Sequence, residues 1–178
     1  MSARMESSNL IKKKICLLGS FGVGKTSLVR RFVFDEFKDS YLSTIGVKVT
    51  EKIVAPVLDS NHKPIQYKFL IWDIEGHDKF NTMIRNYYLG ASGGIFVADL
   101  TRPESVQTLK KTIAVFQEIN PRACLTLAAN KRDLYEENSE ESIKILRQID
   151  NLKIHYLLTS AKTGYNVEKL FYYLANRL

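Results

Sequence analysis

Short apolar runs alternate with amphipathic segments along most of this 178-residue chain. The apolar runs are predicted strands, at residues 15–18, 47–53, 65–72, 94–99, 125–129 and 154–158. Segments with helical spacing lie at 27–33, 104–119, 140–148 and 167–178. Strands that alternate with helices indicate an α/β fold, with a mostly parallel sheet covered by helices on both faces.

The strands at 47–53 and 65–72 depart from this alternation, because no helical segment separates them. Residues 59–64 between them form a turn cluster of Asp, Ser, Asn, His, Lys and Pro. Such a cluster between two strands favours a hairpin, so this pair is predicted to be antiparallel. Residues 1–10 are predicted to be a flexible polar leader, followed by one domain at 11–178.

Composition narrows the class of protein. Apolar residues make up 45% of the chain and charged residues 25%, which is ordinary for a soluble domain. No apolar run is long enough to span a bilayer, and the N-terminus lacks the apolar stretch of a secretion signal. Cys16 and Cys124 both lie in apolar surroundings and are predicted core residues. We therefore expect a reduced, cytoplasmic compartment without a disulfide framework.

The net charge of +7 favours acidic partners or an anionic membrane surface, but only as a weak field effect. The one cluster, at 12–14, runs into the first predicted strand and is interpreted as its solvated beginning. No stretch interleaves aromatic residues with Arg and Lys, so the sequence predicts no nucleic-acid partner.

A glycine-rich loop follows the first predicted strand. Its sequence, Gly19-Ser-Phe-Gly-Val-Gly-Lys-Thr-Ser27, fits the phosphate-loop pattern G-x-x-x-x-G-K-[ST]. A strand, a glycine turn and a helix N-terminus together attract an anion, because backbone N–H groups turn inward and the helix dipole adds positive potential. Lys25 supplies a charge for the β- and γ-phosphates, and the Thr26 hydroxyl a ligand for Mg²⁺. The alternative is a glycine-rich turn with a chance lysine.

A carboxylate ends the third predicted strand. Asp73 and Gly76 form a D-x-x-G pattern about fifty residues after the phosphate loop. Such an Asp is placed to hold Mg²⁺ through its waters, and the glycine can bring its backbone N–H to a γ-phosphate. The alternative is a strand that ends in an ordinary turn.

The strand at 125–129 leads into an N-K-x-D pattern. Asp133 can accept hydrogen bonds from both N1–H and the 2-amino group of guanine, whereas adenine has neither donor. Asn130 can tie this loop to the base and to the phosphate loop, and the stem of Lys131 can lie along the ring. The sequence Ser160-Ala-Lys162 after the last strand can place a backbone N–H at the guanine O6.

On these motifs the chain resembles a small GTPase of the Ras superfamily, closest to the Rab-like branch, from residue 14 to 178. The resemblance implies a P-loop NTPase G domain whose six-stranded sheet has one antiparallel strand. It implies a switch that binds GDP or GTP with Mg²⁺, hydrolyses GTP and acts in signal transduction or vesicle trafficking. Effectors, an exchange factor and an activating protein would contact switch I (36–47) and switch II (74–90). A monomer is expected.

The motif match assigns roles to individual residues. The implied nucleotide contacts are Gly19, Phe21, Gly22, Val23, Gly24, Lys25, Thr26, Ser27, Phe37, Thr44, Gly76, Asn130, Lys131, Asp133, Ser160, Ala161 and Lys162. The implied Mg²⁺ contacts are Thr26, Thr44 and Asp73. The implied catalytic residues are His77, Lys25, Thr44 and Gly76.

Three residues depart from the family pattern. His77 stands where relatives usually carry the Gln that orients water, so it is a working substitute, part of a slow site awaiting a partner, a relic, or a plain surface residue. Phe21 replaces a small residue, and its ring could occupy the space of a partner's arginine finger or fold over switch I. Glu75 replaces a frequent Ala, and we expect it to point to solvent without a role.

Other features leave alternatives open. Tyr87 and Tyr88 resemble part of a Rab partner surface, but they could equally cap the core, or one could do each. The sequence ends at Leu178 without a terminal Cys, so no prenylation site is seen. Either a tail has been removed, or the protein works without a lipid anchor; peripheral membrane contact stays open.

Three functions compete. A regulatory GTPase that both switches and hydrolyses is favoured. A nucleotide-bound interaction module with negligible hydrolysis is the second, supported by His77 and Phe21. A phosphate-loop kinase or ATPase is the third, and the N-K-x-D pattern argues against it.

Overall fold

The computed structural model describes residues 10–38, 44–58, 61–76 and 82–178, with the backbone alone described at 82–84. Apart from Leu10, the predicted leader lies outside the described residues. His77 lies outside them too.

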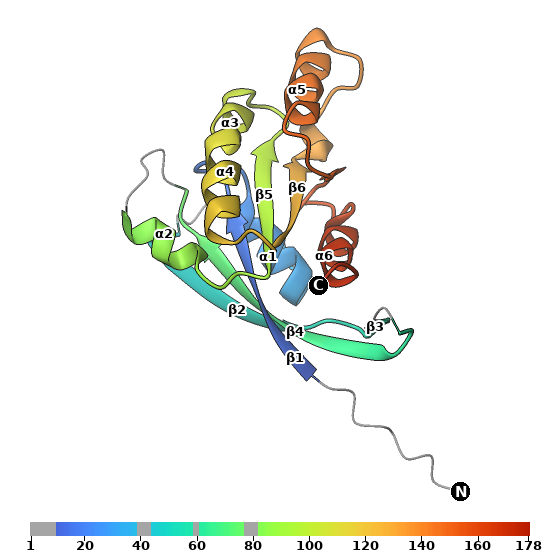
Figure 1. Cartoon of the computed structure of the whole chain (residues 1–178). Helices are drawn as coiled ribbons and strands as arrows, with labels where there is room; N and C mark the ends of the chain where they lie inside the picture. The colour runs from blue at the N-terminus through green and yellow to red at the C-terminus, as the bar shows by residue number, and fades with distance from the viewer. Residues whose placement is uncertain (1–9, 39–43, 59–60, 77–81) are drawn as a thin grey trace, which may run out of the picture.

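Six strands lie side by side in the order β2-β4-β1-β5-β6-β7 (Figure 1). Their bounds are β1 (Leu10–Leu18), β2 (Val47–Ile53), β4 (Pro64–Ile74), β5 (Gly93–Asp99), β6 (Cys124–Asn130) and β7 (Tyr156–Leu158). Neighbouring strands are parallel except β2 and β4, which are antiparallel. The predicted sheet and hairpin are therefore confirmed. A two-residue strand, β3 (Val57–Leu58), also pairs with β4 and was not predicted.

Helices cover both faces of the sheet, as predicted (Figure 1). One face packs against α1 (Lys25–Phe34) and α6 (Val167–Ala175). The other packs against α2 (Thr82–Tyr88), α3 (Glu104–Gln107), α4 (Leu109–Ile119) and α5 (Glu140–Asp150). A short 3-10 helix, η1 (Arg132–Leu134), follows β6.

The central strand β1 shows how one apolar run serves both faces. Ile15 and Leu17 belong to the core beneath α1 and α6, whereas Cys16 and Leu18 belong to the core on the other face. Successive side chains of a strand point to opposite faces, so a strand covered on both sides is apolar throughout. Lys14 precedes this run, and its ammonium lies 3.7 Å from the centre of the Trp72 ring.

The prediction of a single helix over 104–119 is wrong at one position. The structure divides it into α3 and α4 at Thr108. This residue keeps helical dihedrals (φ −69°, ψ −26°), but its hydroxyl donates to the Ser105 carbonyl at 3.2 Å. Such a bond back to the preceding turn competes with the helical backbone ladder.

The parallel strands all end at the same edge of the sheet. Loops after β1, β4, β5, β6 and β7 therefore meet there, which is where ligands bind in open α/β sheets. In the described part of the chain, no helix has the length and apolar character needed to cross a membrane.

Candidate nucleotide site

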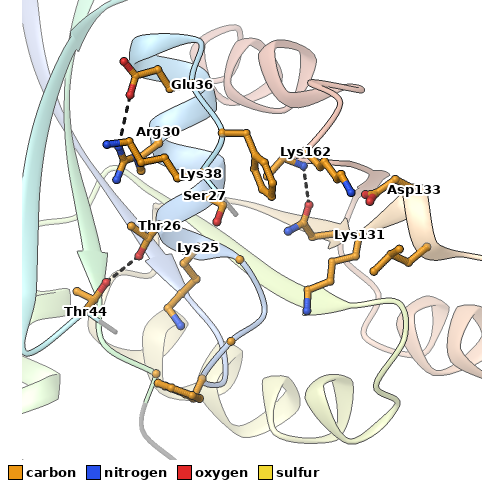
Figure 2. Close-up of a pocket in the computed structure, with 18 residues that line it drawn as sticks. Lys25, Thr26, Ser27, Arg30, Glu36, Lys38, Thr44, Lys131, Asp133 and Lys162 are labelled. Atoms are coloured by element: carbon orange, nitrogen blue, oxygen red, sulfur yellow. Dashed lines mark hydrogen bonds and ion pairs between the residues drawn. The ribbon is translucent and has the colours of Figure 1, made fainter. Parts of the chain in front are cut away.

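A cavity of about 330 Å³ opens at this edge of the sheet (Figure 2). The predicted contact residues that line it are Phe21, Gly22, Gly24, Lys25, Thr26, Ser27, Phe37, Thr44, Gly76, Asn130, Lys131, Asp133, Ala161 and Lys162. Arg30, Glu36, Lys38 and Leu134 also line it and were not predicted. The fold thus brings the phosphate loop, both switch segments and the N-K-x-D loop to one cavity.

The phosphate loop turns into α1 at Gly24, whose φ is +99°. A Cβ there would lie 2.3 Å from Nδ2 of Asn130, so a side chain is excluded by both strain and space. Lys25 follows and is 6% exposed. Its Nζ donates to the carbonyls of Gly19 and Ser20 at 2.8 and 2.9 Å. These bonds hold the ammonium at the loop, where a phosphate would sit.

Burial lowers the pKa of Lys25 to about 8, although the negative charges of Asp73 and Glu75 oppose the shift. A positive charge that burial destabilises gains strongly from an anion. The loop is thus electrostatically suited to phosphate.

Three oxygen groups converge beside the phosphate loop. Thr26 donates to Oδ2 of Asp73 at 2.5 Å. The hydroxyl of Thr44 lies 2.7 Å from that of Thr26 (Figure 2) and 3.4 Å from the same carboxylate oxygen. Asp73 is 1% exposed, and among the described residues nothing donates to its Oδ1. Burial raises the pKa of the Asp73 carboxyl, while the Thr26 hydrogen bond and the Lys25 charge oppose it.

A buried carboxylate oxygen without a partner is costly unless a cation supplies one. Hydroxyl and carboxylate oxygens are the ligands that Mg²⁺ prefers. The residues predicted for Mg²⁺ therefore fit that ion.

Gly76 brings the start of switch II against the phosphate loop. A Cβ at this position would lie 2.5 Å from the Phe21 nitrogen and 2.7 Å from the Ser20 carbonyl oxygen. Only glycine allows this approach, and Gly76 lines the cavity beside Phe21.

The N-K-x-D loop is tied to its neighbours as the sequence predicted. Nδ2 of Asn130 donates to the carbonyl of Val23 at 2.9 Å, and its Oδ1 accepts from the Ala161 amide at 3.2 Å. Asp133 accepts from the Ser160 hydroxyl at 2.5 Å, and Ser160 itself is 1% exposed. This bond fixes the carboxylate at the cavity wall, opposite Thr26 and Thr44 (Figure 2).

Four of the residues predicted to bind the nucleotide or Mg²⁺ do not line the cavity, but contact residues that do. Gly19 and Val23 contribute carbonyls to Lys25 and Asn130, Ser160 orients Asp133, and Asp73 lies beneath Thr26. They shape the site through other residues.

Arg31 is a supporting residue that the sequence analysis missed. From α1 its guanidinium donates to the carbonyls of Ala161 and Lys162, at 3.0 and 2.7 Å. The first helix thus braces the loop after β7. No sequence signal marks this role, because the residue lies within an ordinary amphipathic helix.

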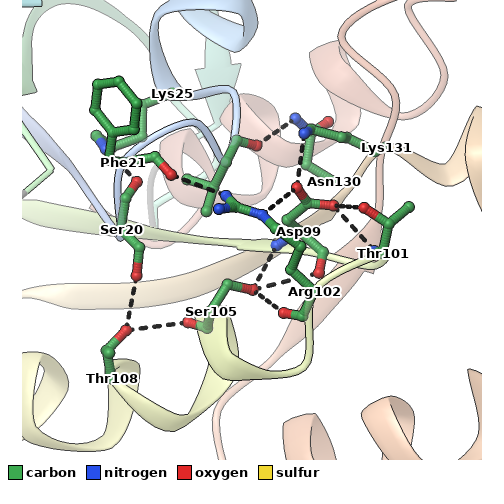
Figure 3. A network of polar contacts seen from close by, with 11 residues as sticks. Ser20, Phe21, Lys25, Asp99, Thr101, Arg102, Ser105, Thr108, Asn130 and Lys131 are labelled. Atoms are coloured by element: carbon green, nitrogen blue, oxygen red, sulfur yellow. Dashed lines mark hydrogen bonds and ion pairs between the residues drawn. The ribbon is translucent and has the colours of Figure 1, made fainter. Parts of the chain in front are cut away.

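A second missed residue, Asp99, ends β5 and is completely buried (Figure 3). It accepts from Nζ of Lys131 at 2.6 Å, from the Thr101 hydroxyl at 2.7 Å and from Nε of Arg102 at 2.9 Å. Burial alone would raise the pKa of this carboxyl, but the hydrogen bonds from these donors together hold it below its usual value.

The same network reaches the phosphate loop. Arg102 also donates to the Phe21 carbonyl at 2.8 Å, and the hydroxyls of Ser20 and Thr108 share a hydrogen bond of 2.9 Å (Figure 3). Asp99 therefore joins the phosphate loop to the N-K-x-D loop. In the sequence, the position of Asp99 at the end of a predicted strand was the one signal that could have indicated this role.

Glu75 corrects an expectation. Instead of pointing to solvent without a contact, its Oε2 accepts from the backbone amide of Gly46 at 2.7 Å. The side chain is only half-buried, but it connects the two switch segments.

The remaining residues fall into place as follows. The Phe21 side chain is 50% exposed. Tyr88 is 3% exposed and packs against Phe116, so one tyrosine does belong to the core. Tyr87 is half-buried near Trp72, with ring centres 6.4 Å apart.

Comparison with known proteins agrees with this geometry. A family model described as "Ras family" matches residues 14–178. The chain is 39% identical over 171 residues to the Ras-related protein RABF2a of Arabidopsis thaliana, covering 94% of this chain and 82% of that protein. It is 35% identical over 171 residues to the Ras-related protein Rab5 of Nicotiana tabacum, covering 96% and 82%. Identity to human Ras-related protein Rab-22A is 33% over 166 residues, covering 93% and 82%.

Proposed function

The chain belongs to the Ras family, as a Rab-like member, and we propose that it is a switch that binds GDP and GTP with Mg²⁺ and hydrolyses GTP slowly without a partner. One observation carries the proposal. A carboxylate suited to guanine, Asp133, is fixed in the same cavity as the phosphate-loop lysine, Lys25. ATP would leave that carboxylate without its two donors.

Each part of the nucleotide has residues to receive it. Asp133 would accept from the base, and a backbone N–H of the Ser160-Ala-Lys162 segment would serve the guanine O6. Lys25 and the backbone N–H groups of the phosphate loop would hold the β- and γ-phosphates. Thr26, Thr44 and Asp73 would hold Mg²⁺, which neutralises phosphate charge when bound.

Hydrolysis would proceed by in-line attack of water on the γ-phosphorus. The bond between that phosphorus and the bridging oxygen breaks, giving GDP and inorganic phosphate. Lys25 and the Gly76 N–H would stabilise the charge on the phosphate oxygens. We propose that His77 orients the attacking water, in place of the glutamine usual in relatives.

Nucleotide specificity gives the first test. Purified protein would be titrated with fluorescent GDP, and GDP, GTP and ATP would compete for the site with and without Mg²⁺. We expect displacement by both guanine nucleotides and not by ATP, and loss of binding in Lys25→Ala. Lys169→Ala, an exposed residue of α6, is the matched control. Equal displacement by ATP would contradict the proposal and favour a kinase or ATPase.

Single-turnover GTP hydrolysis tests His77. We expect His77→Ala to be slower than the wild type, because water would lose its orienting group. Equal rates would remove His77 from the mechanism. Rates indistinguishable from uncatalysed hydrolysis in both proteins would favour the second candidate, a GTP-bound interaction module.

Phe21 favours a weak response to activating proteins that insert an arginine finger. Its ring is half-exposed at the phosphate end of the cavity and cannot hydrogen-bond to phosphate. We expect little stimulation of the wild type by such a protein and a larger one of Phe21→Ser. Strong stimulation that is equal in both proteins would show that the ring is no obstacle.

Partners are proposed on the same basis. Effectors, an exchange factor and an activating protein would contact switch I and switch II, and the Rab names of the relatives favour vesicle trafficking. We propose a cytoplasmic monomer that contacts membranes peripherally. Gel filtration with light scattering would test the oligomeric state.

A further inference from the structure

The antiparallel pairing of β2 and β4 continues one step beyond the two strands. Val47 pairs with Ile74 at the end of the ladder. One residue further, the Glu75 amide donates to the Gly46 carbonyl at 2.8 Å. The Gly46 amide donates in turn to the Glu75 side chain, at 2.7 Å. Glu75 thus binds both backbone groups of Gly46, one with its main chain and one with its carboxylate.

This double contact lies next to the groups that would respond to a γ-phosphate. Gly46 comes two residues after Thr44, and Glu75 directly precedes Gly76. Thr44 lies beside Thr26 and Asp73, with its hydroxyl 2.7 Å from that of Thr26 and 3.4 Å from Oδ2 of Asp73. The contact between Gly46 and Glu75 therefore lies next to the segment that places Thr44.

The charge of the Glu75 carboxylate also affects the pKa of Lys25, which lines the cavity. Together with Asp73, its negative charge opposes the fall in the pKa of Lys25 that burial causes. A hydrogen bond from a backbone amide to a carboxylate is charge-assisted and stronger than one between neutral groups.

We propose that Glu75 is a positioning residue that ties switch I to switch II through Gly46, and so helps to keep Thr44 beside Thr26 and Asp73. This inference rests on the proposed function, because it concerns the conformational order of switch I and switch II. One consequence is that switch I keeps part of its order with GDP bound. The contrast that partners sense between GDP and GTP is then smaller than if Thr44 were released completely.

Two substitutions distinguish the hydrogen bond to the Gly46 amide from the negative charge of Glu75. Glu75→Ala removes the acceptor. Glu75→Gln keeps a carbonyl oxygen that can accept from Gly46 but removes the charge. Glu51→Ala is the matched control, because Glu51 lies on β2 and pairs with Lys68 away from the cavity. Strand β5 amides provide an internal reference for global stability.

Residue-level amide hydrogen exchange, followed by NMR, measures the effect in the GDP–Mg²⁺ form and after removal of nucleotide with EDTA. Thr44 and Ile45 are the informative positions, since a purely local bond would affect Gly46 alone. Relative to β5, we expect exchange at Thr44–Gly46 to be roughly tenfold faster in Glu75→Ala, the effect of losing one strong hydrogen bond. Glu51→Ala should stay within about twofold of the wild type, and Glu75→Gln, which keeps a weaker neutral acceptor, should lie between the wild type and Glu75→Ala.

Unchanged exchange at Thr44 and Ile45 in Glu75→Ala would overturn the proposal. Exchange in Glu75→Gln as fast as in Glu75→Ala would overturn it too, because an acceptor would remain without effect. Neither result depends on guanine binding, which the competition experiment tests separately. Failure to bind GDP would therefore overturn the proposed function and leave the exchange result interpretable.

Discussion

Three aspartates, two at strand ends and one in η1 just after a strand, show how the surroundings of a side chain determine its possible role. Asp73 is buried with one oxygen that has no partner among the described residues, and burial raises its pKa, so it suits a cation. Asp99 is equally buried, but its cationic and hydroxyl donors hold its pKa low, so it stays charged at neutral pH. Asp133 is exposed to the cavity and held by Ser160, so it remains open to a ligand. The same type of side chain is thus suited to a cation, to the framework or to a ligand, according to its surroundings.

Asp133→Asn should reverse the preference for the base. Asn keeps one acceptor but presents an NH₂ group to the 2-amino group of guanine, so GDP affinity should fall about 100-fold or more. Xanthosine diphosphate carries a carbonyl at that place and should bind the variant better than the wild type. Competition against fluorescent GDP and fluorescent xanthosine diphosphate measures both. Unchanged GDP affinity would exclude Asp133 from base recognition.

Asp99→Asn should lower stability and flatten its dependence on acid. The folded-state pKa of Asp99 lies below the unfolded value, so its contribution is present above about pH 4 and is lost as the pH falls through the folded pKa. At pH 7 the variant should lose roughly 1.5–3 kcal/mol of unfolding free energy, the worth of hydrogen bonds to a charged group. Urea unfolding between pH 3 and 7 measures both effects. Glu141→Gln, on the exposed first turn of α5, should match the wild type.

At the level of elements, loops in the site are braced by neighbours that do not face the ligand. Helix α1 holds the loop after β7 through Arg31. The loop after β5 holds the phosphate loop through Arg102, and the start of α4 does so through Thr108 and Ser20. Such braces reduce the freedom that a loop loses when a ligand orders it.

Arg102→Ala should therefore speed the release of GDP. The variant loses the bond to the Phe21 carbonyl and one partner of Asp99, while every residue lining the cavity is kept. We expect a dissociation rate roughly fivefold to tenfold higher, the effect of about 1 kcal/mol. Displacement of fluorescent GDP by excess unlabelled GDP gives the rate. Arg122→Ala, an exposed position outside the nucleotide cavity, serves as the control and should release GDP like the wild type.

For the whole molecule, the site joins segments from one end of the chain to the other. Residues that line the cavity range from Phe21 to Lys162. Most of them lie at or after the ends of β1, β4, β6 and β7, and the others lie between α1 and β2. Unfolding of the domain would therefore destroy the site. A ligand that binds here stabilises the entire fold by mass action.

Mg²⁺ and GDP should accordingly raise the melting temperature. At a free concentration 1,000 times the dissociation constant the gain is about 4 kcal/mol. For a domain of this size that corresponds to roughly 8–16 °C. Thermal unfolding with GDP, ATP or EDTA measures the shift. We expect none with ATP and a greatly reduced one in Lys25→Ala; an equal shift with ATP and GDP would refute the specificity of the site.

The sequence by itself determined the sheet, its hairpin and the class of ligand expected. Each motif directly follows an apolar run, and parallel strands bring such positions to one edge, so spacing along the chain was enough to predict the convergence. Local patterns did not place the break at Thr108, because this residue keeps helical dihedrals and the apolar spacing around it is helical throughout.

Only the tertiary structure decided which groups support the site. Arg102 meets Phe21 across 81 positions, and Glu75 meets Gly46 across 29. Such contacts depend on the direction of a single side chain after the elements have packed. The spacing of apolar residues along the sequence does not predict that direction. The family and the motifs that predict a ligand were therefore readable from the chain, whereas the bracing of the loops, and the contact of Glu75 with Gly46, became visible only in the folded molecule.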